Sequence, residues 1–286
     1  MKARRVIGFG DNVVDRYTNQ RVMFPGGNAV NVAVYAKKMG MDAAYLGVFA
    51  NDFMGDHIKH ALNDVGVVID HCITKEGVSG YCDVILEDGN RIFQEWNEGG
   101  ISVKEPIIVG DAELEYLSQF EFIHSGCFAG LEGELPKLKG LNGIISFDFA
   151  EDEEFKEDSY LETVCPYIDI AQFSADDFTE EEIEAFAKHV CSYGTKYVLV
   201  TQGAKGQTFY DGTNFHKGVV HLIDPVDTMG AGDSFMTAFT MSMLERGWTK
   251  NSVLSAEAIK ESFEIAAEFS ANNCLQEGSF GYKKEY

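Results

Sequence analysis

The chain has 286 residues, of which 45% are hydrophobic and 12% aromatic, and these proportions predict a folded globular protein with one large core. Its formal net charge of −23 argues against partners such as nucleic acid or an anionic membrane surface, so an anionic ligand would need a pocket lined by backbone N–H groups or a metal. Six scattered cysteines without a C-x-x-C pair indicate neither a zinc site nor a disulfide framework, and no run of about 18 apolar residues occurs. We therefore expect a soluble cytoplasmic protein.

Short β-rich runs alternate with helical patterns along the chain. The expected strands are 5–10, 43–49, 120–126, 143–149, 167–173 and 196–202. The helix candidates between them include 28–40, 53–66 and 180–194. Apolar strands separated by helices are typical of a mostly parallel sheet that is covered by helices.

One stretch departs from this alternation. The segment "GYCDVILEDGNRIFQEWNEGG" (80–100) contains two alternating strands around an Asp88-Gly89 turn, which predicts a hairpin. Together with "DRYTN" (15–19) it would form a small sheet that stands off the main one as a lid, and an ordinary edge hairpin is the alternative. We expect one domain over 1–286 with a β lid from about 12–20 and 77–100. Exposed apolar residues on the outer face of the hairpin would indicate a homodimer.

Asp11 and Asp15 follow the first expected strand in "GFGDNVVD". The Gly pair invites a dinucleotide interpretation, but Val13 occupies the third fingerprint position and no helix pattern follows. Carboxylates at the carboxyl end of a parallel strand can bind sugar hydroxyls, and a role as turn residues is the alternative.

The segment "PGGNAVNVAV" (25–34) is more specific. Two glycines allow the backbone to approach a ligand closely, and Asn28 and Asn31 share one face at the start of a helix. Two amides offer donors and acceptors that suit a polyhydroxylated ligand. Asn28 alone would be read as an N-cap, but Asn31 lies inside an otherwise apolar helix, so we favour a binding role for the pair.

The segment "DTMGAGDSF" (227–235) places two aspartates six residues apart around a Gly-Ala-Gly turn. A Gly-rich turn that opens a helix exposes backbone N–H groups that attract anions, and phosphate most naturally. Asp233 in such a cradle could take a proton from a hydroxyl that attacks a phosphate. Stabilisation of the helix start by an acid is the alternative, and these nine residues alone do not separate the two.

A second Gly-rich turn follows an expected strand in "VTQGAKGQTFYDG" (200–212). Lys205, between Gly203 and Gly206, would lie either near phosphates or in a plain hairpin turn. The sequence contains no Walker A or protein-kinase motif, and its seven histidines form no H-x-x-x-H or H-E-x-x-H spacing. A metal would therefore come with nucleotide phosphates, as Mg²⁺ usually does.

Three segments in this order, "GGNAVNVAVYAKKMG", "VTQGAKG" and "DTMGAGDSF", resemble the signatures of the PfkB, or ribokinase-like, family of carbohydrate kinases over about residues 6–280. The resemblance implies a three-layer α/β/α fold with a mostly parallel central sheet and a small β lid. It also implies phosphorylation of a primary sugar hydroxyl with Mg-ATP, and in some members a monovalent cation such as K⁺. "GDNVVD" and "NRIFQEWNEG" are most similar to members that phosphorylate fructoselysine. A kinase for fructose, ribose or a nucleoside, and a catalytically silent sugar-binding regulatory relative, are the alternatives.

The resemblance also implies roles for individual positions. Asp233 matches the catalytic base of the family. The family's anion hole, whose N–H groups stabilise the transferring phosphoryl group, corresponds to Gly230, Ala231 and Gly232. The positions that match sugar-binding residues are Asp11, Asp15, Gly27, Asn28, Asn31 and Arg91. Those that match nucleotide-binding residues are Ser174, Thr201, Gly203, Gly206 and Asn273. Asp177 would hold Mg²⁺ through water, and Asp227 would contribute to a monovalent-cation site.

Two segments depart from the family pattern. Where many relatives carry Asn-x-x-Glu near the metal and phosphates, this chain reads "SADD" (174–177). The family's Gly-Ala segment near the C-terminus appears as "NNCLQEGSFG" (272–281), which leaves the adenine contacts there undefined. Neither departure affects the expected base.

Overall fold

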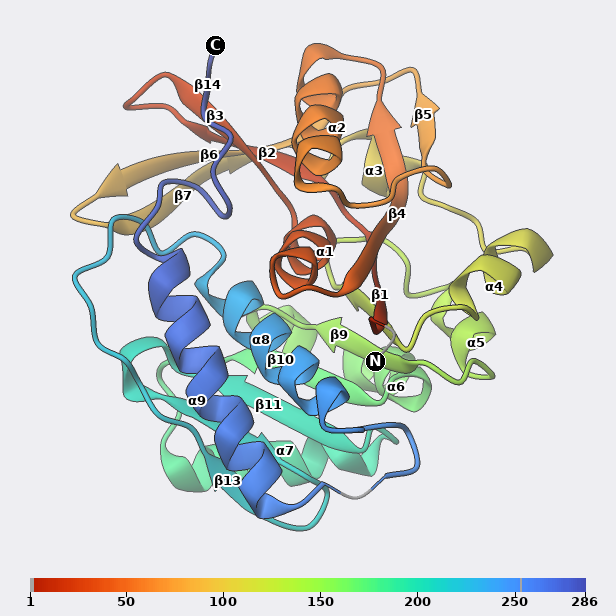
Figure 1. Cartoon of the computed structure of the whole chain (residues 1–286), viewed down its shortest axis with the longest axis vertical. Helices are drawn as coiled ribbons and strands as arrows, with labels where there is room; N and C mark the ends of the chain where they lie inside the picture. Colours follow the sequence, from red (N-terminus) through yellow and green to blue (C-terminus); the bar gives the residue numbers. More distant parts are fainter. Residues whose placement is uncertain (1–2, 253) are drawn as a thin grey trace.

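A large sheet forms the centre of the molecule (Figure 1). Within residues 3–252 and 254–286, which this computed structural model describes, nine strands form it in the order β13-β12-β11-β10-β9-β8-β1-β4-β5. Neighbours from β11 to β5 are parallel, whereas β12 and β13 are antiparallel. Their bounds are β1 Arg5–Gly10, β4 Asp42–Ala50, β5 Ile73–Lys75, β8 Phe122–Gly126, β9 Ile144–Asp148, β10 Ile170–Ser174, β11 Tyr197–Thr201, β12 Gln207–Tyr210 and β13 Phe215–Lys217. All six expected strands are confirmed.

Helices cover both faces of this sheet. In Figure 1, α8 and α9 (blue) lie over one face, and α6 and α7 lie behind the other. The helix bounds are α1 Asn28–Lys38, α2 Phe53–Val65, α3 Ile101–Lys104, α4 Asp111–Leu117, α5 Leu135–Leu138, α6 Asp158–Val164, α7 Glu180–Ser192, α8 Ala231–Glu245 and α9 Ala256–Asn273. None of the helices in the described part of the chain is long and apolar enough to cross a membrane.

The strands divide their apolar side chains between two cores because successive residues of a strand point to opposite faces. Val6 and Phe122 belong to the core shared with α8 and α9, where Phe239 and Phe263 also pack. Their neighbours in sequence, such as Ile7 and Ile123, belong to the core on the opposite face. Burial on both faces explains why the strands appear as continuous apolar runs in the sequence. The three-layer α/β/α fold is thereby confirmed.

A second, smaller sheet has the strand order β14-β3-β2-β6-β7 and lies at the end of the molecule where the chain terminates (Figure 1). Its bounds are β2 Val13–Tyr17, β3 Val22–Gly26, β6 Gly80–Glu87, β7 Asn90–Trp96 and β14 Lys284–Glu285. β2 pairs with β6 in parallel, and β6 and β7 form the antiparallel hairpin expected over 80–100. The sequence did not lead us to expect β3 and β14 in this sheet.

The hairpin turn has Asp88 at φ 49° and Gly89 at φ 75°, and positive φ values at both positions are typical of a tight type I′ turn. The turn lies against the segment that precedes α8. The Thr228 N–H donates to the Gly89 carbonyl at 3.1 Å. Arg91 Nη1 donates to the Thr228 carbonyl at 2.9 Å and to Thr228 Oγ1 at 3.2 Å. The small sheet thus contacts the Gly-rich turn through its hairpin.

One face of the small sheet is turned toward this contact, and we call it the inner face. Strand registers place the following side chains on it: Asp15 and Tyr17 from β2, Cys82, Val84 and Leu86 from β6, and Arg91, Phe93 and Trp96 from β7. Tyr17 and Val84 pack against Met229, just before α8. Arg16, Asp83 and Ile92 lie on the opposite, outer face.

Candidate active site

The turn at the start of α8 requires glycine. Gly230 is the residue before the helix and has φ 71°, which side chains disfavour. A Cβ atom there would lie 2.4 Å from the Tyr35 hydroxyl oxygen. The N–H groups of Gly230, Gly232 and Asp233 have no acceptor among the described residues, as expected of a helix N-terminus that can bind an anion. The Ala231 N–H differs from our expectation, because it donates to the Thr228 carbonyl at 3.1 Å.

Asp233 lies in the first turn of α8 and faces α1. Its Oδ1 accepts from Asn28 Nδ2 at 2.8 Å, and its Oδ2 accepts from Asn31 Nδ2 at 2.7 Å. The carboxylate therefore bonds to a neighbouring helix instead of capping its own. The two amides do share one face, and both donate to Asp233. The binding role that we favoured for the pair stays a prediction. Burial raises the pKa of Asp233, and the hydrogen bonds from Asn31 and Asn28 oppose this rise.

Asp148, at the end of β9, is a second carboxylate beside Asp233. Asn28 Nδ2 donates to Asp148 Oδ2 at 2.8 Å, so one amide group bridges both acids. The Ala150 N–H donates to Asp148 Oδ1 at 2.9 Å, and Gln172 Nε2 lies 3.3 Å from Oδ2. Burial, followed by the charge of Asp233, raises the pKa of Asp148 to about 7. Two bridged acids with raised pKa values are a common arrangement for proton transfer.

His124 fixes the orientation of the bridging amide. It lies on β8 with 0% exposure, its Nε2 is hydrogen-bonded to Asn28 Oδ1, and its Nδ1 lies 2.8 Å from Ser146 Oγ. Burial lowers the pKa of His124 to about 3, so the ring is neutral and carries one N–H. Because Asn28 Oδ1 can only accept, Nε2 must carry the proton and Nδ1 must accept from Ser146. The Asn28 amino group is therefore directed toward the two carboxylates.

Asp11 and Gly27 form the start of α1. Asp11 Oδ2 accepts from the Asn28 N–H at 2.7 Å, and Oδ1 accepts from the Ala29 N–H at 3.1 Å, so this acid caps the helix from a neighbouring loop. Gly27 has φ 105°, and a Cβ there would lie 2.9 Å from Asp11 Oδ2. Burial raises the pKa of Asp11 to about 6. The structure thus gives Asp11 a capping role in addition to any sugar contact.

Asp15 differs from the other buried acids near the site. It is 5% exposed, and its carboxylate has no hydrogen-bond donor within residues 3–252 and 254–286. A Cβ at Gly26 would lie 2.5 Å from Asp15 Oδ2, so this glycine makes room for the carboxylate. Burial and the charge of Asp227 raise the pKa of Asp15 to about 7, and the charge of Arg91 opposes this. Asp15 therefore remains a largely buried acid that accepts no hydrogen bond in the described part of the protein, while its oxygens keep some contact with solvent.

Two positions implied by the resemblance have structural roles here. The Asp227 carboxylate accepts from the Tyr17 hydroxyl at 2.6 Å, the Gly278 N–H at 2.8 Å and the Met229 N–H at 2.9 Å. It is fully buried, so these donors hold the carboxylate in place. The expected cation role of Asp227 stays a prediction.

The buried Asn273 amide has similar protein partners. It donates to the Tyr35 hydroxyl at 3.1 Å and to the Ser279 carbonyl at 2.9 Å, and it accepts from Gln276 Nε2 at 2.7 Å. Its side chain therefore holds the C-terminal loop in place. A direct contact with nucleotide, as we expected, would require these bonds to be replaced.

The remaining nucleotide positions lie at the carboxyl ends of β10 and β11. Ser174 Oγ and Thr201 Oγ1 lie 3.2 Å apart, and both Gly203 and Gly206 have positive φ. These glycines belong to a turn between the antiparallel strands β11 and β12, which favours the hairpin interpretation of this segment.

Two charged side chains near this turn were expected to lie close to phosphate or its metal ion, and both expectations stay predictions. Lys205 Nζ is hydrogen-bonded to the Asp176 carbonyl. Asp177 is exposed in the turn after β10. Among the described residues, no group of three or more His, Cys, Asp or Glu side chains could hold a metal ion.

Asp148 and His124 are the site residues that sequence reasoning missed. Asp148 ends the expected strand 143–149, just as Asp11 follows the first strand, so the rule that identified Asp11 could have identified it. His124 lies inside an expected strand, and no spacing marks it as different from a core histidine.

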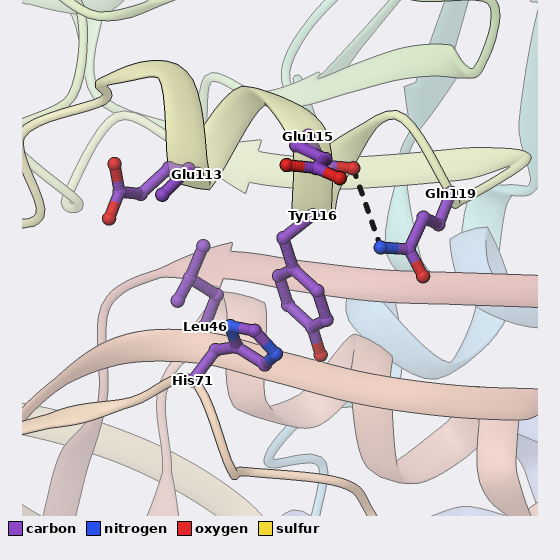
Figure 2. A pocket seen from close by; sticks show the side chains of 7 residues that line it. Leu46, His71, Glu113, Glu115, Tyr116 and Gln119 are labelled. Carbon is purple, nitrogen blue, oxygen red and sulfur yellow. Dashed lines mark hydrogen bonds between the residues drawn. The ribbon is translucent and has the colours of Figure 1, made fainter.

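A separate cavity of about 300 Å³ lies away from these residues (Figure 2). Its lining consists of Leu46, His71, Ala112, Glu113, Glu115, Tyr116 and Gln119. The His71 and Tyr116 rings stack with centroids 3.6 Å apart. No predicted site residue lines this cavity, so we assign it no part in the candidate active site.

The fold and the Gly-rich helix start define a carbohydrate kinase of the ribokinase-like class, and comparison with known proteins supports this assignment. The model of the pfkB family carbohydrate kinases matches residues 2–281, so the chain belongs to this family. Fructosamine kinase FrlD of Bacillus subtilis is 36% identical over 284 residues, which cover 99% of this chain and 95% of that protein. Fructoselysine 6-kinase of Escherichia coli is 33% identical over 90% of this chain and 94% of its own.

A solved structure of Arabidopsis thaliana ribokinase complexed with ribose and ATP has a similar fold. It matches with a TM-score of 0.79 and 20% sequence identity, over 99% of this chain and 96% of that one. The likeness therefore supports the fold, whereas the curated relatives support the kinase activity.

Proposed function

We propose that the protein transfers the γ-phosphoryl group of ATP to the 6-hydroxyl of fructoselysine or a closely related sugar-amine adduct, with Asp233 as the general base. The observation that carries this proposal is the position of Asp233. It is a partly buried carboxylate with a raised pKa, placed beside backbone N–H groups that lack acceptors. The names of the two relatives above, which share a third of their residues with this chain, support the choice of substrate.

The proposed reaction is an in-line displacement. Asp233 takes the proton of the attacking 6-hydroxyl, whose oxygen bonds to the γ-phosphorus while ADP leaves. The free N–H groups of Gly230 and Gly232 stabilise charge on the transferring group. Asn28 and Asn31 hold Asp233 in position through its two oxygens. Below its raised pKa the carboxyl group is protonated and cannot accept the hydroxyl proton, so turnover should fall as the medium becomes acidic.

Mg²⁺ belongs to this proposal as the partner of ATP. It commonly binds through substrate phosphates, water and one or two carboxylates, so a dedicated protein cage is not required. Asp148 ends β9 and Asp177 is exposed in the turn after β10, so these two carboxylates would hold the ion at the carboxyl ends of the strands. When bound, the ion would neutralise the phosphate charges. The free thiols of the described cysteines suit the reducing cytoplasm, where we place the protein.

The substrate is tested by ADP release from Mg-ATP with the purified protein. The acceptors are fructoselysine, the corresponding adduct of a second amino acid, fructose, ribose and adenosine. We expect selective turnover of the sugar-amine adducts. Turnover of fructose, ribose or adenosine instead would retain the kinase chemistry and reject the proposed acceptor. If no acceptor is used although ATP and fructoselysine both bind, the silent regulatory alternative would replace the proposal.

The role of Asp233 is tested by Asp233→Asn. We expect turnover to fall roughly 10²- to 10⁴-fold, because the amide cannot accept the hydroxyl proton, while sugar and ATP still bind. Asp70→Asn is the matched control, since Asp70 is exposed and lies outside the site. Unchanged turnover in Asp233→Asn would exclude this residue as the base.

A homodimer formed through the small sheet stays a prediction. β7 is an edge strand, and Ile92 on its outer face is 44% exposed. Light scattering coupled to size-exclusion chromatography would test it. A monomer at micromolar concentration would reject this assembly.

A further inference from the structure

The inner face of the small sheet has two features that take no part in the proposed transfer step itself, although the family resemblance matches one of them, Asp15, to a sugar-binding position. One is Asp15, a buried acid without a donor among the described residues. The other is a pair of aromatic side chains, Phe93 and Trp96, which are 49% and 46% exposed although they point toward the site. A largely buried acid without a protein donor and an exposed aromatic surface both indicate a place where a ligand binds.

The unpaired groups around Asp15 are acceptors. Asn31 uses its amino group on Asp233, and its Oδ1 is buried without a partner in the described residues. Asp11, Asp227 and Asp233 add negative charge near Asp15, and Arg91 is the cation that acts on it. Such a group of acids is best complemented by a ligand that brings hydrogen-bond donors and positive charge.

The aromatic residues lie beside Asp15 across the strands. Asp15 is in register with Cys82, and Cys82 is in register with Trp96, so Asp15 and Trp96 are two strand spacings apart, or about 10 Å. The ring of Phe128, from the loop after β8, meets Trp96 edge to face at 5.5 Å between centroids. Asp15, Cys82 and Trp96 thus lie in one row across the inner face, and we call this row, together with Phe128, the strip.

We propose that this strip is a subsite for the substituent that distinguishes a sugar-amine from a free sugar. Asp15 binds the protonated amine, and Trp96 with Phe128 packs against the aliphatic chain that follows it. A secondary alkylamine is protonated at neutral pH, so it supplies the charge that the acids lack. This inference rests on the proposed function, because free fructose carries neither the amine nor the chain. A sugar hydroxyl could also donate to Asp15, and charge separates the two possibilities.

The aromatic part is tested with a series of fructose adducts of ethylamine, propylamine, butylamine and pentylamine. In the wild type we expect kcat/KM to rise with each added methylene, by at most about fourfold per step. In Trp96→Ala this rise should be markedly smaller, while kcat/KM for fructose is unchanged. Ile92→Ala is the control, because Ile92 is similarly exposed on the same strand but points to the outer face. It should retain the wild-type rise.

The charge is tested with Asp15→Asn and two matched acceptors, the butylamine adduct of fructose and its isostere with an ether oxygen in place of the amine nitrogen. We expect the wild type to prefer the amine roughly 10- to 100-fold in kcat/KM, as for a desolvated ion pair. Asp15→Asn should remove most of this preference, even if it weakens both acceptors through shared hydroxyl contacts.

The outcomes separate this inference from the proposed function. If the wild type phosphorylates sugar-amines but Trp96→Ala keeps the full rise with chain length, the aromatic contact is wrong and the kinase function stands. An amine preference that persists in Asp15→Asn would likewise reject Asp15 as the amine partner. If the wild type uses fructose and no sugar-amine, the proposed substrate fails and the subsite fails with it.

Discussion

The two sides of the candidate site differ in how far the protein satisfies its own polar groups. Around Asp233, amides of α1 bond to both carboxylate oxygens, and His124 in turn fixes one of those amides. On the inner face of the small sheet, Asp15 has no donor within the described residues, and aromatic rings are half exposed. A group held by the protein is preorganised for chemistry, whereas a group left unpaired is available for recognition. The following variants test this distinction.

Gly230→Ala should have the largest effect. The new methyl group would approach the Tyr35 hydroxyl to 2.4 Å, and alanine disfavours φ 71°, so the turn must shift and displace the free N–H groups. We expect kcat to fall roughly 10²- to 10³-fold. Tyr35→Phe removes the clashing oxygen, so the double variant Gly230→Ala/Tyr35→Phe should recover part of the loss. Full activity in Gly230→Ala alone would contradict the role of this turn.

Asn28→Ala should have the next largest effect. It removes the amino group that bridges Asp148 and Asp233, and we expect kcat to fall roughly 10- to 100-fold. Because the hydrogen bond from Asn28 lowers the pKa of Asp233, its loss should raise that pKa further and move the acid limb of the kcat profile to higher pH. Asn63→Ala, at an exposed position of α2, is the control. An unmoved acid limb would show that the bridge does not tune the base.

His124→Leu should have a smaller effect on the same bridge. Without the ring N–H, the Asn28 amide is free to turn its oxygen toward the carboxylates, so we expect kcat to fall about tenfold. His124→Gln keeps a donor and should restore part of kcat, whereas a purely structural role would make the two variants alike. Circular dichroism and thermal unfolding would establish that both variants are folded.

Asp15→Asn should show its effect in stability. Burial raises the pKa of Asp15 from 3.8 to about 7, so between about pH 4 and pH 7 the folded protein holds a proton that the unfolded chain releases. This contribution to stability is therefore lost as pH rises through 7. Asparagine cannot ionise, so the variant should unfold a few degrees higher than the wild type at pH 8, and the difference should shrink toward pH 4. Equal unfolding temperatures at pH 8 would show that Asp15 has a partner in solution.

The sequence predicted the fold well because the central strands are buried on both faces and separated by clear helices. All six expected strands occur in the large sheet. β3 and β14 were missed for local reasons: "VMFPG" ends in proline and glycine, which normally indicate a turn, and β14 has two residues. Their pairing depends on segments far away in the chain.

The site was predicted in part. Asp233, Asn28 and Asn31 are indeed brought together, since the Gly-rich turn and the amide spacing are local signals. The partners of each group were not predictable, because they are set by contacts between distant elements. Asp227 and Asn273 bond to Tyr17 and Tyr35, which no motif connects to them.

The contact between the hairpin and the segment before α8 allows the opening of the small sheet to be followed by hydrogen exchange. Three hydrogen bonds join them, from the Thr228 N–H to Gly89 and from Arg91 to Thr228. The Thr228 amide is protected from deuterium while its bond to Gly89 lasts, and it exchanges when the hairpin lifts away. Its exchange rate therefore measures how often the small sheet opens, and it can be measured in the intact protein without an attached probe.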